Sequence, residues 1–474
     1  MKRRFLPGSN GDGRTRPGPF SVARLVDEAG DPHSLYAETV NPQFVRLLRA
    51  IGFDKHWVRG EGSYLEDVDG HRYLDLLGGF GMYALGRNNA KIRAALEETL
   101  ALDTPGRVQL GLSPLPGLLA RELLARVPSR LGRVLFTSSG TEAVEAAIKL
   151  GRAATGRSRV LSTDGSFHGL TLGSLSATGS EDFTEPFRPL LPGVGRVPFN
   201  DLEALERELA REDVALFLVE PVQGKGVVLP LAGYLQGAQE LCRRHGTLFT
   251  LDEVQTGLGR TGKLFAFEHW GLEPDVVTVA KALSGGYVPS GACLLRDDTL
   301  AAVFDSLEHA VRHGSTFAPN DLAMAAGLAV LHELDEQGLV ARSQRLGDTL
   351  LEATRPLRER YEVVKDVRGL GLMWAIEFGE PERGRRSWRF LERMQEGIFS
   401  QLVVGPLFHQ HRILTQVASH RLNVLKILPA LTIGEEDLDR FATALDDVIR
   451  RAERIPSAAA RMALRSGTHL LNRS

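Results

Sequence analysis

Between about residue 90 and residue 330, short apolar runs alternate with longer stretches of helical periodicity. This alternation predicts an α/β domain with a mostly parallel sheet, because parallel strands need a crossover helix between them. The clearest apolar runs are residues 133–136, 159–162, 214–219, 248–251 and 276–279. In an open sheet of this kind, ligands bind at the carboxyl ends of the strands. We therefore expect the polar residues that follow these five runs to form one site.

The rest of the chain predicts a second, smaller domain. Residues 63–75 contain two short runs on either side of Asp69 and Gly70, a pattern typical of a β-hairpin. Beyond residue 330, charged helical stretches alternate with short apolar runs at 372–378 and 424–428. The expected fold is therefore α/β, with a large domain and a smaller α+β domain built from both ends of the chain.

The domain boundaries follow from these changes of pattern. Residues 1–30 are basic and rich in Gly and Pro, without the apolar core of a signal peptide, and are expected to form a mobile tail. The other expected segments are the N-terminal part of the small domain at 31–80, the large domain at 81–335, the C-terminal part of the small domain at 336–455, and a terminal helix or tail at 456–474.

The composition is that of an ordinary globular protein. With 474 residues the chain can bury a large core, and its net charge of −2 gives no reason to expect a nucleic acid or a membrane as partner. Cys242 and Cys293 provide neither a disulfide framework nor a thiolate cluster, so we expect no metal site and a reducing cytoplasm. No apolar stretch of the sequence is long enough to span a bilayer.

The last two of the five runs end in residues of opposite charge. Asp252 follows the run 248–251, and Lys281 follows the run 276–279 after one alanine. A lysine at the end of a buried strand must be neutralised, paired or used covalently. Pyridoxal phosphate (PLP) needs these two groups, a carboxylate for its ring nitrogen and an amine for its Schiff base. Alone, the pair only suggests a PLP site.

The first two runs lead into residues that suit other parts of the same cofactor. Ser139, Gly140 and Thr141 begin an alanine-rich stretch, where the free N–H groups of a helix start would bind a phosphate. A plain Ser/Thr helix cap is the common alternative. Phe167 could stack on a flat ring or belong to the core. His168 has no second metal-type residue near it in sequence, and we interpret it as a structural or supporting residue.

The turns after the third and fourth runs add three polar residues. Glu220 directly follows the run 214–219 and is expected beside the cofactor pocket. Gln255 lies three residues beyond Asp252. Lys225 lies in a Gly-rich turn, where a solvated side chain is the ordinary alternative to a binding role.

One glycine motif points to a different cofactor. Residues 257–262 match the G-x-G-x-x-G pattern of dinucleotide-binding proteins. The match does not directly follow an apolar run, and the aromatic-rich residues 263–267 after it do not begin a helical pattern. A nicotinamide cofactor is therefore disfavoured.

Taken together, these segments resemble class III aminotransferases (ω-amino acid and diamine aminotransferases) of PLP fold type I. The segments that carry the resemblance, in family order, are residues 139–143, 167–169, 252–262 and 280–286, and the similarity extends over roughly residues 60–450. Within the family, the nearest likeness is to putrescine aminotransferases. The segments behind that likeness are residues 76–81, 175–178 and 187–193.

The resemblance implies a role for each site residue. Lys281 forms the Schiff base and moves the proton, Asp252 pairs with the ring nitrogen, and Gln255 lies near the ring hydroxyl. Phe167 stacks on the ring, while Gly140 and Thr141 bind the phosphate. The cofactor site then comprises Ser139, Gly140, Thr141, Phe167, His168, Glu220, Asp252, Val254, Gln255 and Lys281, with Ser315 and Thr316 reaching in from a neighbouring subunit. A homodimer with shared active sites is the expected active unit.

The sequence departs from the family where the substrate should bind. Lys426 stands where members that take α-carboxylates carry an arginine, and Ala430 where they carry a proline. Lys225 stands where the partner glutamate of that arginine is usual, and Arg87 where a histidine is common. Lysine lacks the planar fork with which arginine grips a carboxylate. We expect the substrate pocket to include Tyr83, Lys225 and Lys426. These departures indicate either a pocket adapted to a different substrate or random substitution at a site that is no longer used.

We therefore expect a transaminase whose partners are an amine donor and an oxo acid such as 2-oxoglutarate or pyruvate. The donor would be a diamine, an ω-amino compound or an amino group of a specialised metabolite. The alternative is a PLP-dependent lyase or epimerase acting on a phosphorylated or otherwise anionic amine, because Lys225 and Lys426 could bind an anion. A PLP-binding protein without catalysis is disfavoured, since it need not keep Lys281, Asp252 and Gln255 together.

Overall fold

The computed structural model describes residues 20–106, 108, 111–382, 385–394, 397–418 and 422–453. Residues 1–19 of the expected tail and the whole expected terminal segment 456–474 lie outside this range. Within the expected tail, Val22–Glu28 form the helix α1, whose N-terminus is capped by the Ser21 hydroxyl. The described part of that segment is thus helical, which the Gly- and Pro-rich composition did not predict.

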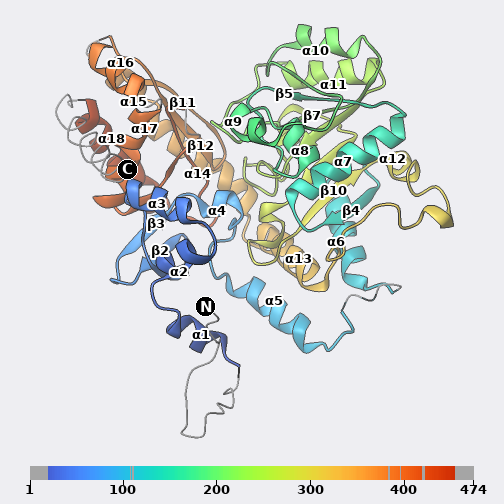
Figure 1. Ribbon diagram of the computed structural model, residues 1–474, viewed down its shortest axis with the longest axis horizontal. Helices are drawn as coiled ribbons and strands as arrows, with labels where there is room; N and C mark the ends of the chain where they lie inside the picture. The colour runs from blue at the N-terminus through green and yellow to red at the C-terminus, as the bar shows by residue number, and fades with distance from the viewer. Residues whose placement is uncertain are drawn as a thin grey trace, which may run out of the picture.

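The large domain is built on a seven-stranded sheet with the strand order β4-β10-β9-β8-β7-β5-β6 (Figure 1). Within this sheet, β10 runs antiparallel to both of its neighbours, whereas the pairs among β5 to β9 are parallel. The strands are β4 (Arg133–Thr137), β5 (Arg159–Thr163), β6 (Val194–Val197), β7 (Val214–Val219), β8 (Leu248–Asp252), β9 (Val276–Val279) and β10 (Gly291–Leu295). All five predicted runs are strands, and the mostly parallel sheet is confirmed.

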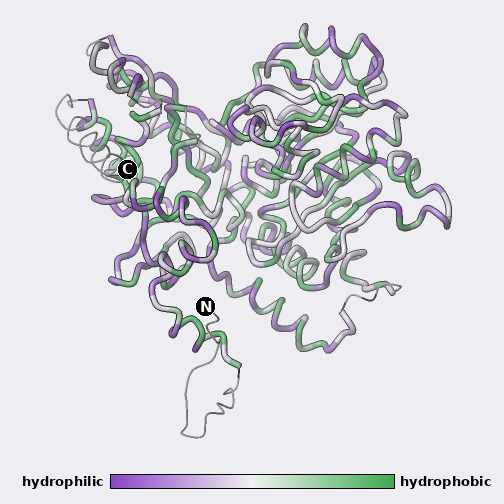
Figure 2. The backbone as a smooth tube through the Cα atoms, viewed as in Figure 1, coloured by the Kyte–Doolittle hydropathy of each residue, from purple (hydrophilic) through white to green (hydrophobic). Residues whose placement is uncertain are grey.

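Helices cover both faces of this sheet, because successive residues of a strand point to opposite sides. Leu216 and Leu218 of β7 pack in one apolar cluster with the helix α7 (Gly140–Thr155), while Phe217 packs in another with α11 (Tyr234–Arg244). Figure 2 shows hydrophobic segments inside the sheet and more hydrophilic ones on the outer helices. The other helical elements here are α5 (Ala90–Ala101), α6 (Pro114–Leu124), α8 (Leu172–Ala177), α9 (Glu181–Thr184), η1 (Glu185–Phe187), α10 (Leu202–Leu209), η2 (Ala266–Trp270), η3 (Lys281–Ser284), α12 (Asp297–Ala301), η4 (Leu307–His309) and α13 (Asp321–Glu336).

Both ends of the chain contribute to the smaller domain, as expected. One sheet has the order β1-β2-β3-β13, and its parallel pair β3–β13 joins the N-terminal to the C-terminal part. The second sheet has the order β11-β12-β15-β14 and is antiparallel. The strands are β1 (Trp57–Glu61), β2 (Tyr64–Asp67), β3 (Arg72–Asp75), β11 (Val364–Leu370), β12 (Met373–Phe378), β13 (Ile413–Leu414), β14 (Gln416–Val417) and β15 (Val424–Ile427). The helices are α2 (Pro32–Thr39), α3 (Pro42–Ile51), α4 (Gly78–Gly81), α14 (Leu339–Thr354), α15 (Leu357–Arg360), α16 (Arg385–Met394), α17 (Ile398–His409) and α18 (Glu435–Glu453).

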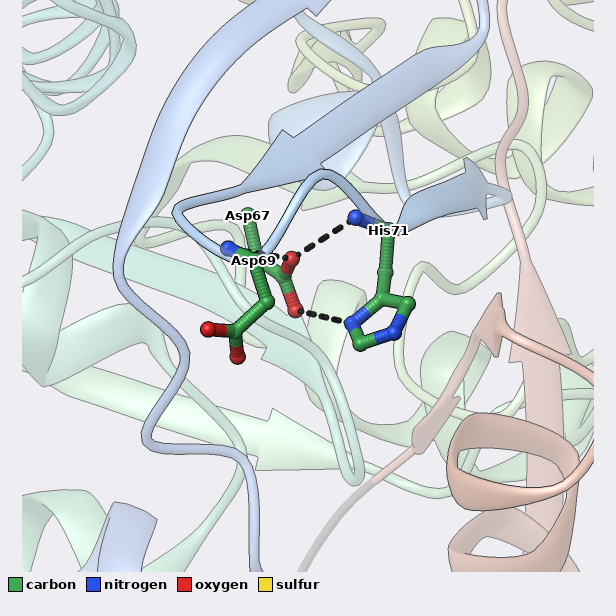
Figure 3. A group of neighbouring side chains, drawn as sticks. All are labelled: Asp67, Asp69 and His71. Carbon is green, nitrogen blue, oxygen red and sulfur yellow. Dashed lines mark hydrogen bonds and ion pairs between the residues drawn. The ribbon is translucent and has the colours of Figure 1, made fainter.

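The predicted hairpin between β2 and β3 is stabilised by one buried carboxylate. Asp67 Oδ1 accepts the backbone N–H groups of Asp69 at 3.1 Å and His71 at 2.9 Å. Asp67 Oδ2 lies 3.3 Å from His71 Nδ1 (Figure 3). The same oxygen lies 3.5 Å from Lys55 Nζ. A side chain that bonds the backbone two residues on is typical of Asp at a turn, so we assign this group a structural role.

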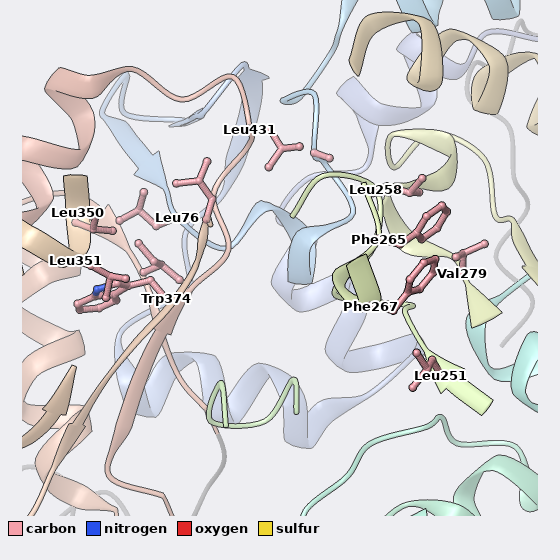
Figure 4. Packing of buried hydrophobic residues seen from close by; sticks show 14 of the residues in the cluster. Leu76, Leu251, Leu258, Phe265, Phe267, Val279, Leu350, Leu351, Trp374 and Leu431 are labelled. Atoms are coloured by element: carbon pink, nitrogen blue, oxygen red, sulfur yellow. The ribbon is translucent and has the colours of Figure 1, made fainter. Parts of the chain in front are cut away.

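A single apolar cluster connects the two domains. It includes Leu76 and Trp374 from the small domain together with Phe265 and Phe267 from the large one (Figure 4). The Trp374 indole N–H also donates to Thr354 Oγ1 at 3.2 Å, which satisfies its one polar atom. Among the described helices, none combines the length and the apolar character needed to cross a membrane.

Candidate active site

The two charged residues at the strand ends meet at one edge of the large sheet. β8 and β9 are parallel neighbours, and Asp252 lies opposite Thr278 in their register. Lys281 follows β9 by two residues and begins η3 with φ 45°, in the left-handed region. A non-glycine residue rarely adopts this backbone conformation unless its surroundings impose it. The sequence-based expectation of adjacent strand ends is confirmed.

The environment of Lys281 favours a neutral amine. Burial lowers the pKa of Lys281, while the negative charges of Asp252 and Glu220 oppose this shift. Within the described residues, its Nζ makes no hydrogen bond. Burial disfavours the charged form of an amine, and a neutral amine is the nucleophilic and basic form.

The Asp252 carboxylate is buried and held by three donors. Its Oδ1 accepts from the Thr278 hydroxyl at 3.0 Å and from the Val254 backbone N–H at 3.0 Å. Its Oδ2 lies 2.7 Å from His168 Nδ1. The other ring nitrogen of His168, Nε2, is buried and has no hydrogen-bond partner among the described residues. His168, which we interpreted as a supporting residue, therefore orients Asp252.

Glu220 connects two segments of the site. Its Oε1 accepts the Phe167 backbone N–H at 2.9 Å, and its Oε2 accepts the Gly224 backbone N–H at 2.8 Å. Burial raises the pKa of Glu220, although these bonds and the His168 charge lower it. The Phe167 ring lies against Phe183 of α9, with centroids 5.6 Å apart in a T-shaped pair. Glu220 thus fixes both Phe167 and the turn that carries Lys225.

The expected phosphate loop lies at the start of α7. The Ser139 hydroxyl accepts from the Glu142 backbone N–H at 3.3 Å, so Ser139 is the helix cap that we considered as the alternative. A Cβ on Gly140 would lie only 2.9 Å from Val254 Cγ1, so this close approach requires glycine. The first N–H groups of a helix remain free to bind an anion. Capping and phosphate binding are therefore compatible here.

The Thr141 hydroxyl belongs to a cluster that the sequence did not reveal. It lies 2.7 Å from the hydroxyl of Thr171 and 2.5 Å from that of Ser174. Thr171 and Ser174 lie at the start of α8, about 30 residues away in sequence. No spacing rule connects them to Thr141, because the contact depends on how α8 packs on α7.

Two further expected cofactor residues lie near this region. Gln255 donates through Nε2 to the Phe80 carbonyl oxygen at 3.2 Å, and its buried Oε1 has no partner among the described residues. Ser315 Oγ lies 3.2 Å from Ser138 Oγ of the same chain, directly before the phosphate loop. The contribution of Ser315 and Thr316 to a neighbouring subunit stays a prediction.

The expected substrate residues converge only in part. Lys426 on β15 is 5% exposed and donates to the Gly224 carbonyl oxygen at 2.8 Å. Burial, with the charges of Lys281 and Lys225, lowers the pKa of Lys426 to about 8. Lys225, in the turn around Gly224, places its Nζ 4.2 Å from the Phe183 ring centre. The turn of the large domain thus meets the second sheet of the small domain through the Lys426 amine.

Tyr83 lies away from these two lysines, and its ring packs against two glycines. A Cβ on Gly286, beyond Lys281, would lie 2.6 Å from the Tyr83 ring, and one on Gly79 would lie 3.0 Å from it. Arg87 stacks on Tyr83 with its guanidinium carbon 4.3 Å from the ring centre. The same arginine forms a 2.8 Å ion pair with buried Asp75. Arg87, noted as a departure from the family, therefore orients Tyr83.

These residues fit PLP. Among the described residues, buried polar atoms at this edge that have no hydrogen-bond partner include His168 Nε2, Lys225 Nζ and Gln255 Oε1. Unsatisfied buried polar atoms are rare and commonly mark a ligand site. The carboxylate of Asp252, the free amine of Lys281 and the helix start at Gly140 match a ring nitrogen, an aldehyde and a phosphate.

Comparison with known proteins decides the family. Residues 53–449 match the model of the family described as aminotransferase class-III. The chain belongs to the class III aminotransferases. It is 37% identical to aminotransferase PigE of Serratia sp. (strain ATCC 39006) over 447 residues, which is 87% of this chain and 52% of that protein. This class III chain thus spans about half the length of that curated relative.

Solved structures agree with this assignment. An amine transaminase from an uncultivated Pseudomonas species, in a PLP-bound form, matches with a TM-score of 0.73 and 31% identity, over 84% of this chain and 95% of that one. A transaminase from the marine bacterium Virgibacillus matches with a TM-score of 0.80 and 26% identity, over 89% of this chain and 99% of that one. The predicted fold type I and PLP as the cofactor of this family are confirmed. The likeness to putrescine aminotransferases stays a prediction.

Proposed function

We propose that this class III aminotransferase catalyses transamination from a primary amine to an oxo acid such as 2-oxoglutarate or pyruvate. The donor is a diamine, an ω-amino compound or an amino group of a specialised metabolite. The observation that carries the proposal is the half-buried Lys281, which follows the strand next to that of Asp252, a carboxylate that Thr278 and His168 hold in place. PLP, when bound, supplies an electron sink for the substrate carbon that loses a proton.

Each site residue would have its own role in the reaction. Lys281 would hold the cofactor covalently and then move the proton at the substrate carbon, because burial lowers its pKa and so favours the neutral, basic form of the amine. Asp252 would keep the ring nitrogen protonated, since its carboxylate is oriented by two side chains and one backbone N–H. Phe167 would cover one face of the ring, and the start of α7 would bind the phosphate.

The test of the proposal is the half-reaction without an oxo acid. We expect a suitable amine to bleach the visible absorption of the bound cofactor, and a subsequently added oxo acid to restore it. We expect Lys281→Ala to lower turnover by at least about 10³-fold, since it removes the general base. Lys91→Ala, at an exposed position of α5, is the matched control. Wild-type protein that cannot be loaded with PLP would refute the proposal.

The second candidate is a lyase or epimerase acting on an anionic amine. The pair of buried amines at Lys225 and Lys426 is the observation that favours it. Such an enzyme would release ammonia or phosphate, or invert a centre, without consuming an oxo acid. Equimolar conversion of amine and oxo acid would exclude it.

We further propose that two copies of the chain form the active unit. The segment between α12 and α13 projects from the large domain (Figure 1) and exposes Leu307 by 96%, Val311 by 87% and Phe317 by 76%. The same segment carries Ser315, which lies beside the phosphate loop. Exposed apolar groups of this size commonly mark protein interfaces. We also place the enzyme in the cytoplasm, since its two cysteines are free and buried.

A further inference from the structure

We propose that Arg260 is a positioning residue of the active site, which holds the segment 78–83 in place across the junction of the two domains. The inference rests on the proposed transamination, because Tyr83 of this segment is an expected substrate residue. It also gives a role to the G-x-G-x-x-G match at residues 257–262, which has no role in the expected PLP site.

Arg260 bonds to the small domain through its side chain and through its backbone. It is 2% exposed, and its Nη1 donates to the carbonyl oxygens of Leu372 at 3.1 Å and Pro429 at 2.5 Å. Its own carbonyl oxygen accepts the Leu372 backbone N–H at 3.0 Å and the Ser343 hydroxyl at 3.0 Å. One residue of the large domain thus connects three separate segments of the small one.

The guanidinium group of Arg260 is not paired with a carboxylate in the described part of the chain. Burial lowers the pKa of Arg260 to about 9. Its Nη2 is shielded from solvent and has no hydrogen-bond partner among the described residues. A buried cation without an opposite charge costs free energy. The charge is therefore a poor source of stability, whereas the two hydrogen bonds of Nη1 fix the relative position of the segments that accept them.

The chain just after β15 connects this junction to the segment 78–83. The Leu428 backbone N–H donates to the Leu76 carbonyl oxygen at 2.7 Å, which lies before the segment. The Leu431 backbone N–H donates to the Ala84 carbonyl oxygen at 2.7 Å, which lies after it. Because the carbonyl group that accepts from Nη1 lies between these two donors, Arg260 fixes both ends of the segment.

The segment 78–83 begins with a backbone conformation that its surroundings must maintain. The four residues of α4 all have φ between 49° and 89°. Phe80, the one that is not glycine, has φ 60°, which such a residue rarely adopts. Arg260 approaches this turn directly, because a Cβ on Gly81 would lie 3.8 Å from both its Nε and its Nη2. Arg260 is thus part of the surroundings that maintain α4.

Two contacts connect the segment to the expected site. The Phe80 carbonyl oxygen accepts from Gln255 Nε2 at 3.2 Å. The Tyr83 ring lies 2.6 Å from where a Cβ on Gly286 would be, in the turn that follows Lys281. A displacement of about 1 Å far from the chemistry can change a rate by about a hundredfold. We therefore expect the position of the segment to set how well the amine donor fits.

The kinetic test compares substitutions at one junction, with pyruvate as acceptor and the fastest-reacting of cadaverine, δ-aminovalerate and pentylamine as donor. Arg260→Met removes both hydrogen bonds of Nη1 and should raise the KM of the donor by about tenfold or more, with a smaller change in kcat. Arg260→Lys lacks the planar fork and should raise it by about threefold, the effect of one lost hydrogen bond. Ser343→Ala, the matched control, removes a bond to the Arg260 backbone and should lower the denaturant midpoint without changing the KM.

Hydrogen–deuterium exchange of the PLP-loaded enzyme gives a second measurement that needs no turnover. The backbone N–H groups of Gly81 and Tyr83 donate to the carbonyl oxygens of Leu77 and Gly78, both at 3.0 Å, so their exchange reports on the segment. We expect exchange there to be about tenfold faster in Arg260→Met and about threefold faster in Arg260→Lys. Ser343→Ala should exchange there as the wild type does.

Two results would overturn the positioning role. The first is a KM and a segment exchange in Arg260→Lys that equal those of the wild type, a comparison that holds even if Arg260→Met does not fold. The second is a rise in KM in Ser343→Ala as large as that in Arg260→Met, which would make the effect one of general stability. If none of the three amines reacts with the wild type, the proposed function is contradicted, and the exchange data alone then support or overturn the role of Arg260.

Discussion

Asp252 and Glu253 are consecutive carboxylates in opposite environments. Asp252 accepts three hydrogen bonds, one of them from His168, and faces the site. Glu253 is 1% exposed, accepts from the Thr256 hydroxyl and from the Phe267 backbone N–H, and faces the core. Burial raises the pKa of Glu253 to about 7 against these hydrogen bonds. Neighbouring positions on a strand end point to opposite faces, which gives these two consecutive carboxylates different surroundings.

The raised pKa of Glu253 predicts that the free energy of unfolding depends on pH. The folded-state pKa of Glu253, about 7, lies above its unfolded value of about 4.5. Its contribution to the free energy of unfolding is therefore full below about pH 4.5 and declines up to about pH 7, by about 3 kcal/mol. Glu253→Gln should remove this decline.

Denaturant unfolding of wild type and Glu253→Gln near pH 5 and near pH 8 measures the effect. We expect the variant to gain stability relative to wild type as the pH rises. Glu97→Gln, on the exposed side of α5, should show no such change. A stability difference between wild type and Glu253→Gln that is equal at both pH values would contradict the assignment.

At the scale of elements, the turn between β7 and α11 depends on a side chain from β11. Arg368 is 14% exposed in its side chain and donates to Gly226 and Val227, while its Nη1 pairs with Asp366 at 2.9 Å and Glu377 at 2.6 Å. Val227 has φ 51°, a conformation that the surroundings must maintain. We interpret Arg368 as a positioning residue for the turn of Lys225.

We expect Arg368→Met to raise the KM for the amine donor by about tenfold or more with a smaller change in kcat, since the bonds it breaks involve a charged donor. Cofactor affinity should stay unchanged, because the expected phosphate loop at the start of α7 and Lys281 at the start of η3 lie in other elements. Arg368→Lys should restore part of the KM.

Arg355 provides the control for this prediction. It lines the same surface cavity of about 480 Å³ as Arg368 but is exposed. Arg355→Met should leave the KM within about twofold, as surface substitutions usually do. Equal effects of the two variants on KM would show that Arg368 acts through general stability and not through the turn.

At the scale of the whole molecule, the site lies between two domains that one apolar core joins. Leu76 and Trp374 on one side pack in the same cluster as Phe265 on the other. Arg260 of the large domain also donates to the Leu372 carbonyl oxygen at 3.1 Å in the small domain. Across the same junction, Lys426 of the small domain donates to the Gly224 carbonyl oxygen of the large one.

Substitutions in the projecting segment between α12 and α13 test the proposed dimer. Replacing both Leu307 and Val311 by Glu should weaken association by about 10²-fold or more, because it places charges in a desolvated interface. Light scattering measures the mass, and we expect a monomer with reduced PLP affinity. Leu231→Glu, at a position that is 65% exposed on another loop, is the control. A double variant that remains dimeric with wild-type PLP affinity would contradict this interface.

Much of the fold and of the expected cofactor site could be predicted from the amino-acid sequence. Strands such as β7 and β9 are continuous apolar runs because both of their faces are buried. Parallel strands bring their carboxyl ends to one edge, so Asp252 and Lys281 could be placed together from their spacing alone. The helix start at Ser139 was equally visible, since its small residues directly precede an alanine-rich stretch.

The substrate side depended on the tertiary structure. Lys225 and Lys426 are 201 positions apart in numbering, and their common environment results from how β15 of one domain packs against a turn of the other. The hydroxyl cluster around Thr141 and the contacts of Arg368 likewise join segments far apart in sequence. The hydrophobic periodicity of a sequence indicates whether a residue is buried within its own helix or strand. The partner of a buried charge depends instead on how distant elements pack together, which no local sequence pattern reveals.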